Sequence, residues 1–125
     1  EIRLNKRRKI AKTYNDFFES KEYVINHSKY IDGHAYHLYV LTVRNRKKLY
    51  DFLRSNNVYG QIHYFPCHLM PYYRSIGWKI GDCPNAEEYY SNCISIPMYP
   101  ELTEFQIDYI LTKIDEFYLD ENEGN

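Results

Sequence analysis

Apolar positions recur at helical spacing in four segments of the chain. Residues 3–19 carry apolar side chains on one face and basic side chains on the other. A second helix is predicted from a cap at Asn45 to about Ser55, where Asn56 and the residues after it supply a stop. Its inward-facing positions are Leu49, Phe52 and Leu53.

Two more helices are predicted in the second half of the chain. A short one begins near Asp82 and continues to Tyr90, with proline in its first turn. The last begins at a capping box, Thr103-Glu-Phe-Gln106. Its apolar face comprises Phe105, Ile107, Ile110, Leu111, Ile114 and Phe117. The acidic tail from Asp120 onward is expected to be disordered.

Aromatic and β-branched residues predict three strands between these helices. His34–Val43 is apolar on both faces, as in a strand that is covered on both sides. Gln61–Phe65 predicts a second strand that ends at Pro66, and Cys93–Pro97 a third. Residues 20–33 are expected to form a loop. This order predicts an α+β fold in which a small antiparallel or mixed sheet packs against helices.

One irregular segment, residues 66–82, is longer than a simple connection requires. Gly77 and Gly81 interrupt it, and loops of this length are usually functional. The overlapping stretch of residues 61–74 holds two histidines, a cysteine, three tyrosines and an arginine. These are groups that bind, titrate or coordinate, so the stretch is the first candidate for a site.

The composition narrows the class of protein. A chain of 125 residues and 15.2 kDa fits a single domain. A formal net charge of -1 provides no positive field for phosphate backbones, and the strands lack the basic and aromatic signature of RNA-recognition sheets. Fifteen tyrosines suit interfaces and polar ligand pockets. A genome with biased composition explains the same excess, and the sequence leaves both explanations open.

The cysteines and the N-terminus indicate the cellular setting. Three cysteines cannot all pair, and none forms a CxxC motif, so reduced thiols in a cytoplasmic protein are expected. No apolar run is long enough for a membrane span, and the first residues do not resemble a signal peptide. The absent initiator methionine and uncapped first helix predict that the chain is part of a longer protein.

The residues bear on three kinds of site: a metal site, a cysteine nucleophile and a phosphate-binding site. His34 and His37 would point to opposite faces of a strand, and the spacing of His63 and His68 matches no closed zinc pattern, so no metal site is predicted. A small buried hydrophobic side chain is favoured for Cys67 over a nucleophile. No glycine-rich phosphate loop is present, but histidine, tyrosine and arginine side chains on a loop can bind a diphosphate.

Five motifs in register resemble the small C-terminal domain of the DegT/DnrJ-type sugar aminotransferases. These motifs are RRKIAKTY over residues 7–14, HAYHLY over 34–39, QIHYFPCHLMPYYR over 61–74, GDCPNAE over 81–87 and ISIPMYPELT over 94–103. The resemblance implies the small domain of a fold-type I aminotransferase. The motifs QIHY and PMYP are most similar to those of the subgroup that aminates a UDP-linked 4-keto-6-deoxy-N-acetylhexosamine. This subgroup serves the synthesis of pseudaminic acid or spore-coat polysaccharide.

The resemblance also implies where the chemistry lies. In this family pyridoxal phosphate, its lysine and its other ligands belong to the larger N-terminal domain. No catalytic, cofactor-binding or metal-binding residue is therefore expected among these 125 residues, and the fragment alone should be inactive. Glutamate as amino donor, a nucleotide-sugar substrate and a homodimer of the full-length protein are implied as well, without nucleic-acid or membrane partners.

The expected domains and substrate contacts follow from the same resemblance. Residues 1–20 correspond to the interdomain helix, 21–119 to the small domain and 120–125 to a disordered tail. His68 is the first candidate for a diphosphate contact, with Tyr64 and Tyr72 as candidates for sugar or phosphate hydrogen bonds. Arg74 is expected at a domain interface or in solvent. The alternative is a stand-alone, non-catalytic interaction or ligand-binding α+β module.

Overall fold

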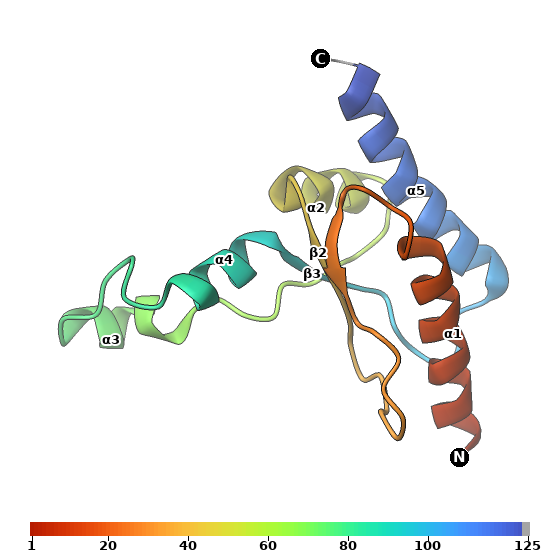
Figure 1. The fold of residues 1–125 in the computed structure, drawn as a ribbon, viewed down its shortest axis with the longest axis horizontal. Coiled ribbons are helices and arrows are strands. Elements are labelled where there is room, and N and C mark those ends of the chain that lie inside the picture. Colours follow the sequence, from red (N-terminus) through yellow and green to blue (C-terminus); the bar gives the residue numbers. More distant parts are fainter. Residues whose placement is uncertain (124–125) are drawn as a thin grey trace.

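A three-stranded antiparallel sheet forms the centre of the protein (Figure 1). The computed structural model describes residues 1–123. The strands are β1 (Val24–His27), β2 (Tyr39–Val43) and β3 (Cys93–Ile96), in the order β1-β2-β3. Tyr39 pairs with Ile96, and Val24 with Val43. Every residue of β3 is buried, as expected for a strand that reads CISI and is covered by helices.

Three helices pack around this sheet. They are α1 (Ile2–Phe18), α2 (Arg46–Ser55) and α5 (Glu104–Glu123). α1 and α5 lie side by side, and α2 lies against α5 near the upper end of the sheet in the view of Figure 1. We call the sheet, these helices and their connections the body, residues 1–61 and 93–123. Its core is built mainly from aliphatic and aromatic side chains, among them Ala11, Tyr14, Phe18, Leu41, Leu49, Leu53, Ile94 and Ile114.

Buried tyrosines form part of this core with their hydroxyl groups satisfied inside the protein. Tyr14 donates to the carbonyl of Pro97 over 2.8 Å, and Tyr39 donates to Oδ1 of Asn15 over 2.6 Å. Burial is the main reason that the pKa values of both phenols lie above their ordinary range. These tyrosines therefore serve the fold, whereas other tyrosines of the chain remain exposed.

The remaining segment, residues 62–92, forms an arm that extends away from the sheet (Figure 1). It contains a short 3-10 helix η1 (Cys67–Leu69), α3 (Pro71–Ser75) and α4 (Pro84–Asn92). Residues 70–82 of the arm are all exposed. The long segment predicted to be irregular is thus a chain of short helices joined by turns.

The predicted α+β class and the four main helices are confirmed, but two strand predictions were wrong. Of His34–Val43 only the second half is β2, because Tyr36 adopts a positive φ of 47° that breaks the strand. Gln61–Phe65 contributes only one bridge, from Gln61 to Ser95. In contrast, the segment expected to be a loop contains β1, an edge strand whose central residues are exposed.

The last helix confirms its predicted start but not every predicted face position. Thr103 and Gln106 exchange capping hydrogen bonds at its N-terminus. Phe105, predicted on the apolar face, is 78% exposed. The helix continues to Glu123, so the first part of the tail expected to be disordered is helical, and residues 124–125 lie outside the described residues. Within residues 1–123 no helix combines the length and apolarity that crossing a membrane requires.

Candidate functional site

The arm is fastened to the body at both of its ends. At its start, Gln61 and Ser95 exchange two backbone hydrogen bonds of 2.9 and 2.7 Å, and Nδ1 of His63 lies 2.8 Å from Oγ of Ser95. At its end, the buried Arg46 donates to the carbonyls of Tyr90 and Ser91 over 2.7 and 3.2 Å. These carbonyls lie in the last turn of α4, where a guanidinium satisfies acceptors that the helix leaves free. The arm therefore leaves the body at a defined place.

Proline and glycine residues set the local structure of the arm. Pro71 and Pro84 occupy the first positions of α3 and α4, where the missing N–H costs no hydrogen bond. Gly77 and Gly81 turn the chain between these helices with φ values of 110° and 94°, which residues with a Cβ atom rarely adopt. The sequence thus favours a short helix, a turn and a second helix.

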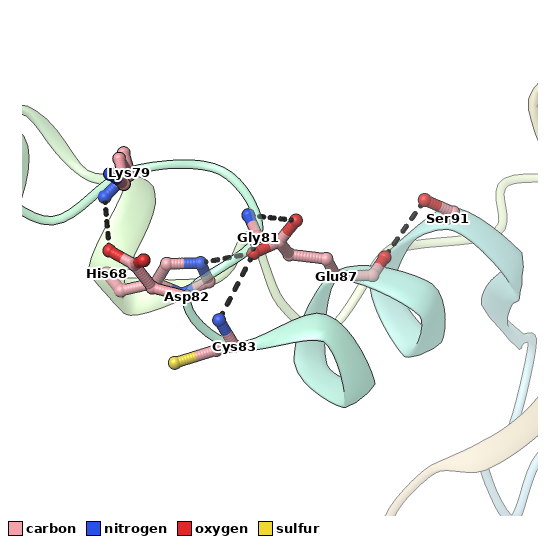
Figure 2. A network of polar contacts seen from close by, with 7 residues as sticks. All are labelled: His68, Lys79, Gly81, Asp82, Cys83, Glu87 and Ser91. Carbon is pink, nitrogen blue, oxygen red and sulfur yellow. Dashed lines mark hydrogen bonds and ion pairs between the residues drawn. The ribbon is translucent and has the colours of Figure 1, made fainter.

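A polar network closes the loop between η1 and α4 (Figure 2). Oε1 of Glu87 lies 2.8 Å from Nε2 of His68, and the same carboxylate accepts from the backbone N–H groups of Gly81 and Cys83. Because an ionised carboxylate can only accept, Nε2 of His68 is the donor. The hydrogen bond from His68 is the main reason that the pKa of Glu87 lies below its ordinary value. The network makes His68 part of the internal structure of the arm.

Large apolar and aromatic side chains cover the outside of the arm. Tyr64 is 71% exposed and Tyr72 69% exposed. The other exposed members are Phe65, Met70, Tyr73, Ile76, Trp78, Ile80 and Tyr89. Such a concentration of exposed apolar side chains is typical of surfaces that contact a partner or a ligand. Tyrosines on this surface also offer hydroxyl groups for hydrogen bonds.

A cavity of about 530 Å³ opens on the body beside the start of the arm. Its wall combines aromatic rings with amide and imidazole groups, including Tyr59, Gln61, His63, Tyr99, Phe105 and Gln106. The volume is typical of a small-molecule pocket. Among the described residues its lining includes no lysine and no carboxylate. It does not fit a cofactor such as pyridoxal phosphate that needs a lysine for covalent attachment and a carboxylate partner for its ring nitrogen.

The residues predicted to contact a substrate share the arm but differ in exposure. Tyr64 and Tyr72 present their rings to the outside, whereas His68 is only 7% exposed. Cys67 is exposed, so its interpretation as a small buried side chain was wrong, and the buried thiol is that of Cys93. Arg74 lies exposed on α3, as expected for a charge at an interface or in solvent.

The histidines outside the arm's network have local roles. His34 and His37 do not lie on a strand, contrary to the prediction, and Nδ1 of His34 accepts from the N–H of Tyr36 over 3.0 Å. Within residues 1–123 no three histidine, cysteine or acidic side chains are grouped as metal ligands.

Glu87 was not singled out from the sequence. Its signal was an acidic residue in the first turn of a helix, from which a side chain can reach back to the N–H of the N-cap residue.

The chain is similar to several known proteins. The chain is 41% identical to the uncharacterized protein MJ1066 of Methanocaldococcus jannaschii over 83% of this chain and 29% of that protein. It is 32% identical to the spore coat polysaccharide biosynthesis protein SpsC of Bacillus subtilis over 87% of this chain and 30% of that one. A DegT DnrJ EryC1 StrS aminotransferase from Brucella abortus is a similar solved structure, with 28% identity and a TM-score of 0.78 over 92% of this chain and 31% of that chain.

The match to a family extends over almost the whole sequence. The chain spans about 30% of the length of the curated relatives named here. Residues 1–115 match the DegT/DnrJ/EryC1/StrS aminotransferase family, and the fold is similar to that of the Brucella structure. This chain therefore belongs to the DegT/DnrJ/EryC1/StrS aminotransferase family.

Proposed function

We propose that this chain is the small C-terminal domain of a pyridoxal-phosphate-dependent aminotransferase. The full-length enzyme transfers the amino group of glutamate to a UDP-linked 4-keto-6-deoxy-N-acetylhexosamine. The family match over residues 1–115 carries this proposal. Two observations support a substrate that is used for a surface polysaccharide or pseudaminic acid. They are the similarity to a spore coat polysaccharide biosynthesis protein and the QIHY motif at residues 61–64.

The cofactor belongs to another part of the proposed enzyme. The cavity of the body offers neither the lysine nor the carboxylate that pyridoxal phosphate requires. On the family resemblance, cofactor and glutamate are assigned to the larger N-terminal part, and this chain is assigned to substrate binding. A cytoplasmic homodimer belongs to the same proposal and rests on the family resemblance.

The arm is the proposed lip of the nucleotide-sugar pocket. Tyr64 and Tyr72 are exposed and carry hydroxyl groups that can bond sugar or phosphate oxygens. His68 was predicted to bond the diphosphate, but its Nε2 is already engaged by Glu87. A second bond, from Nδ1 to a phosphate oxygen, requires the imidazolium form, in which both ring nitrogens are donors. Among the three residues, the two exposed tyrosines are the ones that we propose as direct ligands.

Separate half-reactions of the full-length, cofactor-loaded protein test the proposal. Single-turnover rates are measured with glutamate and with the UDP-linked keto-sugar. Tyr64→Phe and Tyr72→Phe each remove one hydroxyl, so each should slow the sugar half-reaction roughly 2- to 10-fold. The glutamate half-reaction should not change, and Tyr30→Phe, at an exposed position of the body, should change neither.

Two results would contradict the proposal. One is a wild-type protein that accepts an amino group from glutamate but transfers it to no nucleotide-linked keto-sugar. The other is an equal loss in both half-reactions when either tyrosine of the arm is changed. In that case the hydroxyl groups serve the fold of the arm and do not contact the sugar nucleotide.

A further inference from the structure

The outer part of the arm holds its shape without an apolar core of its own. Residues 70–82 are all exposed, and within residues 62–92 only Pro66 and His68 are buried. Burial of apolar surface is the dominant stabilising contribution in most folded segments. For this part of the arm that contribution is small, so polar contacts must hold the loop closed.

The carboxylate of Glu87 joins three separate pieces of the arm. It accepts from Nε2 of His68 in η1, from the N–H of Gly81 in the turn, and from the N–H of Cys83 at the start of α4. The distances are 2.8, 2.9 and 3.3 Å, and Figure 2 shows all three donors converging on this one side chain. Since His68 and Glu87 are 19 positions apart, their contact closes the intervening loop into one unit.

The surroundings strengthen this contact. The side chains of His68 and Glu87 are only 7% and 19% exposed, so water screens the pair less than an ion pair on the open surface. The Trp78 ring meets the His68 ring edge to face, with centroids 6.3 Å apart. The lowered pKa of Glu87 means that its carboxylate is ionised at neutral pH and ready to accept.

We infer that Glu87 and His68 form a latch that positions the arm for the nucleotide sugar. Glu87 is a positioning residue: it holds η1, the turn at Gly81 and the start of α4 together. Because α3 lies in the loop between η1 and this turn, the same contacts restrict the position of Tyr72. His68 acts through the same latch. The role in substrate positioning rests on the proposed function, whereas the latch itself rests on the geometry of this chain.

Amide hydrogen exchange of the full-length protein tests the latch without any substrate. Glu87→Gln removes the charge but retains the size of the side chain. Arm peptides that cover residues 69–83 should exchange roughly 10- to 100-fold faster, because three hydrogen bonds to an ionised acceptor are weakened. Peptides that cover β2 and α5 should not change. Glu88→Gln is the matched control, since Glu88 is the next residue of α4 and is exposed.

A second variant and a kinetic measurement separate positioning from a general loss of stability. His68→Gln should accelerate the same peptides, and the double variant should be no worse than the stronger single variant, as expected for two residues of one contact. In cofactor-loaded protein, Glu87→Gln should lower kcat/KM for the sugar nucleotide roughly 10- to 100-fold through misplacement of the arm. The glutamate half-reaction should keep its rate.

Each outcome decides a different part of the inference. Unchanged exchange of residues 69–83 in Glu87→Gln overturns the latch, whatever the enzyme acts on. Faster exchange without any change in sugar-nucleotide kinetics overturns the positioning role. If the wild-type protein transfers no amino group to a nucleotide sugar, the proposed function fails, and the exchange data still decide whether the latch exists.

Discussion

The body and the arm use tyrosine in opposite ways. In the body, Tyr14 and Tyr39 are fully buried and their hydroxyl groups bond Pro97 and Asn15. In the arm, Tyr64 and Tyr72 expose most of their surface. The tyrosines of the sequence therefore occupy two kinds of position, one in the core of the body and one on the exposed surface of the arm.

The two regions also differ in what holds them together. The body buries a continuous set of apolar side chains between its sheet and helices, whereas residues 70–82 bury none. The arm depends on two anchored ends, on turn residues and on the carboxylate of Glu87. A segment of this kind can change its position at low cost, because few buried contacts must be broken. Buried apolar packing is thus concentrated in the body, whereas recognition is assigned to the arm by the proposed function.

Truncation of a core side chain should show the largest difference between the regions. Leu41 lies at the centre of β2 and is completely buried, so Leu41→Ala should lower the free energy of unfolding by about 2–5 kcal/mol. Ile80→Ala, at an exposed position of the arm, should change it by less than about 0.5 kcal/mol. Urea denaturation of both variants measures the contrast. Equal losses would show that the arm shares the core.

Removal of single hydroxyl groups should give a smaller contrast in the same direction. Tyr14→Phe leaves the carbonyl of Pro97 without its donor, which should cost about 1–3 kcal/mol of unfolding free energy. Tyr72→Phe removes a hydroxyl from an exposed ring and should leave the stability of the protein unchanged. The same denaturation measurement compares them. A stability loss in Tyr72→Phe that matches the loss in Tyr14→Phe would refute the division of roles.

The sequence predicted the longer helices better than the strands, for physical reasons. The last helix carries both a capping box and a regular apolar repeat, and these two local signals agree. β1 lacks such a signal, since it is a short edge strand in which Ile25 and Asn26 are exposed. Gln61–Phe65 has the composition of a strand, but after the single bridge at Gln61 the chain leaves the sheet to begin the arm.

Prediction of the site from the sequence is limited in the same way, because local signals do not contain tertiary contacts. The motif around residues 61–74 drew attention to the segment that begins the arm, to which we assign substrate binding as a proposal. The environment of His68 depends on Glu87, however, and a contact between residues so far apart in sequence cannot be read from spacing. The exposure of Tyr64 and Tyr72 likewise depends on an arm that leaves the body, which only the fold reveals.

Acid should loosen the arm before it affects the body. The pKa of Glu87 is lowered in the folded arm, so the latch is fully present above the ordinary glutamate pKa of about 4.3 and is lost as pH falls through the lower folded value. The charged or titratable groups nearby are His68, Lys79, Asp82 and Cys83. Exchange of arm peptides relative to β2 peptides should rise at acidic pH.

The variant Glu87→Gln provides the control for this acid effect. Without a carboxylate at position 87, the ratio of arm exchange to body exchange should be high already at neutral pH and should show little further rise in acid. A ratio that rises equally in wild type and Glu87→Gln would assign the acid effect to another group.

Ligand protection of the full-length protein tests the central claim most directly. The claim is that the body supplies a stable platform and the arm supplies contacts to a nucleotide sugar. Amide exchange is measured with and without saturating UDP-N-acetylglucosamine as a stable probe. We predict slower exchange across residues 62–83, with β1 and the second half of α5 unchanged. No protection of the arm, together with protection of other parts of the protein, would contradict the account.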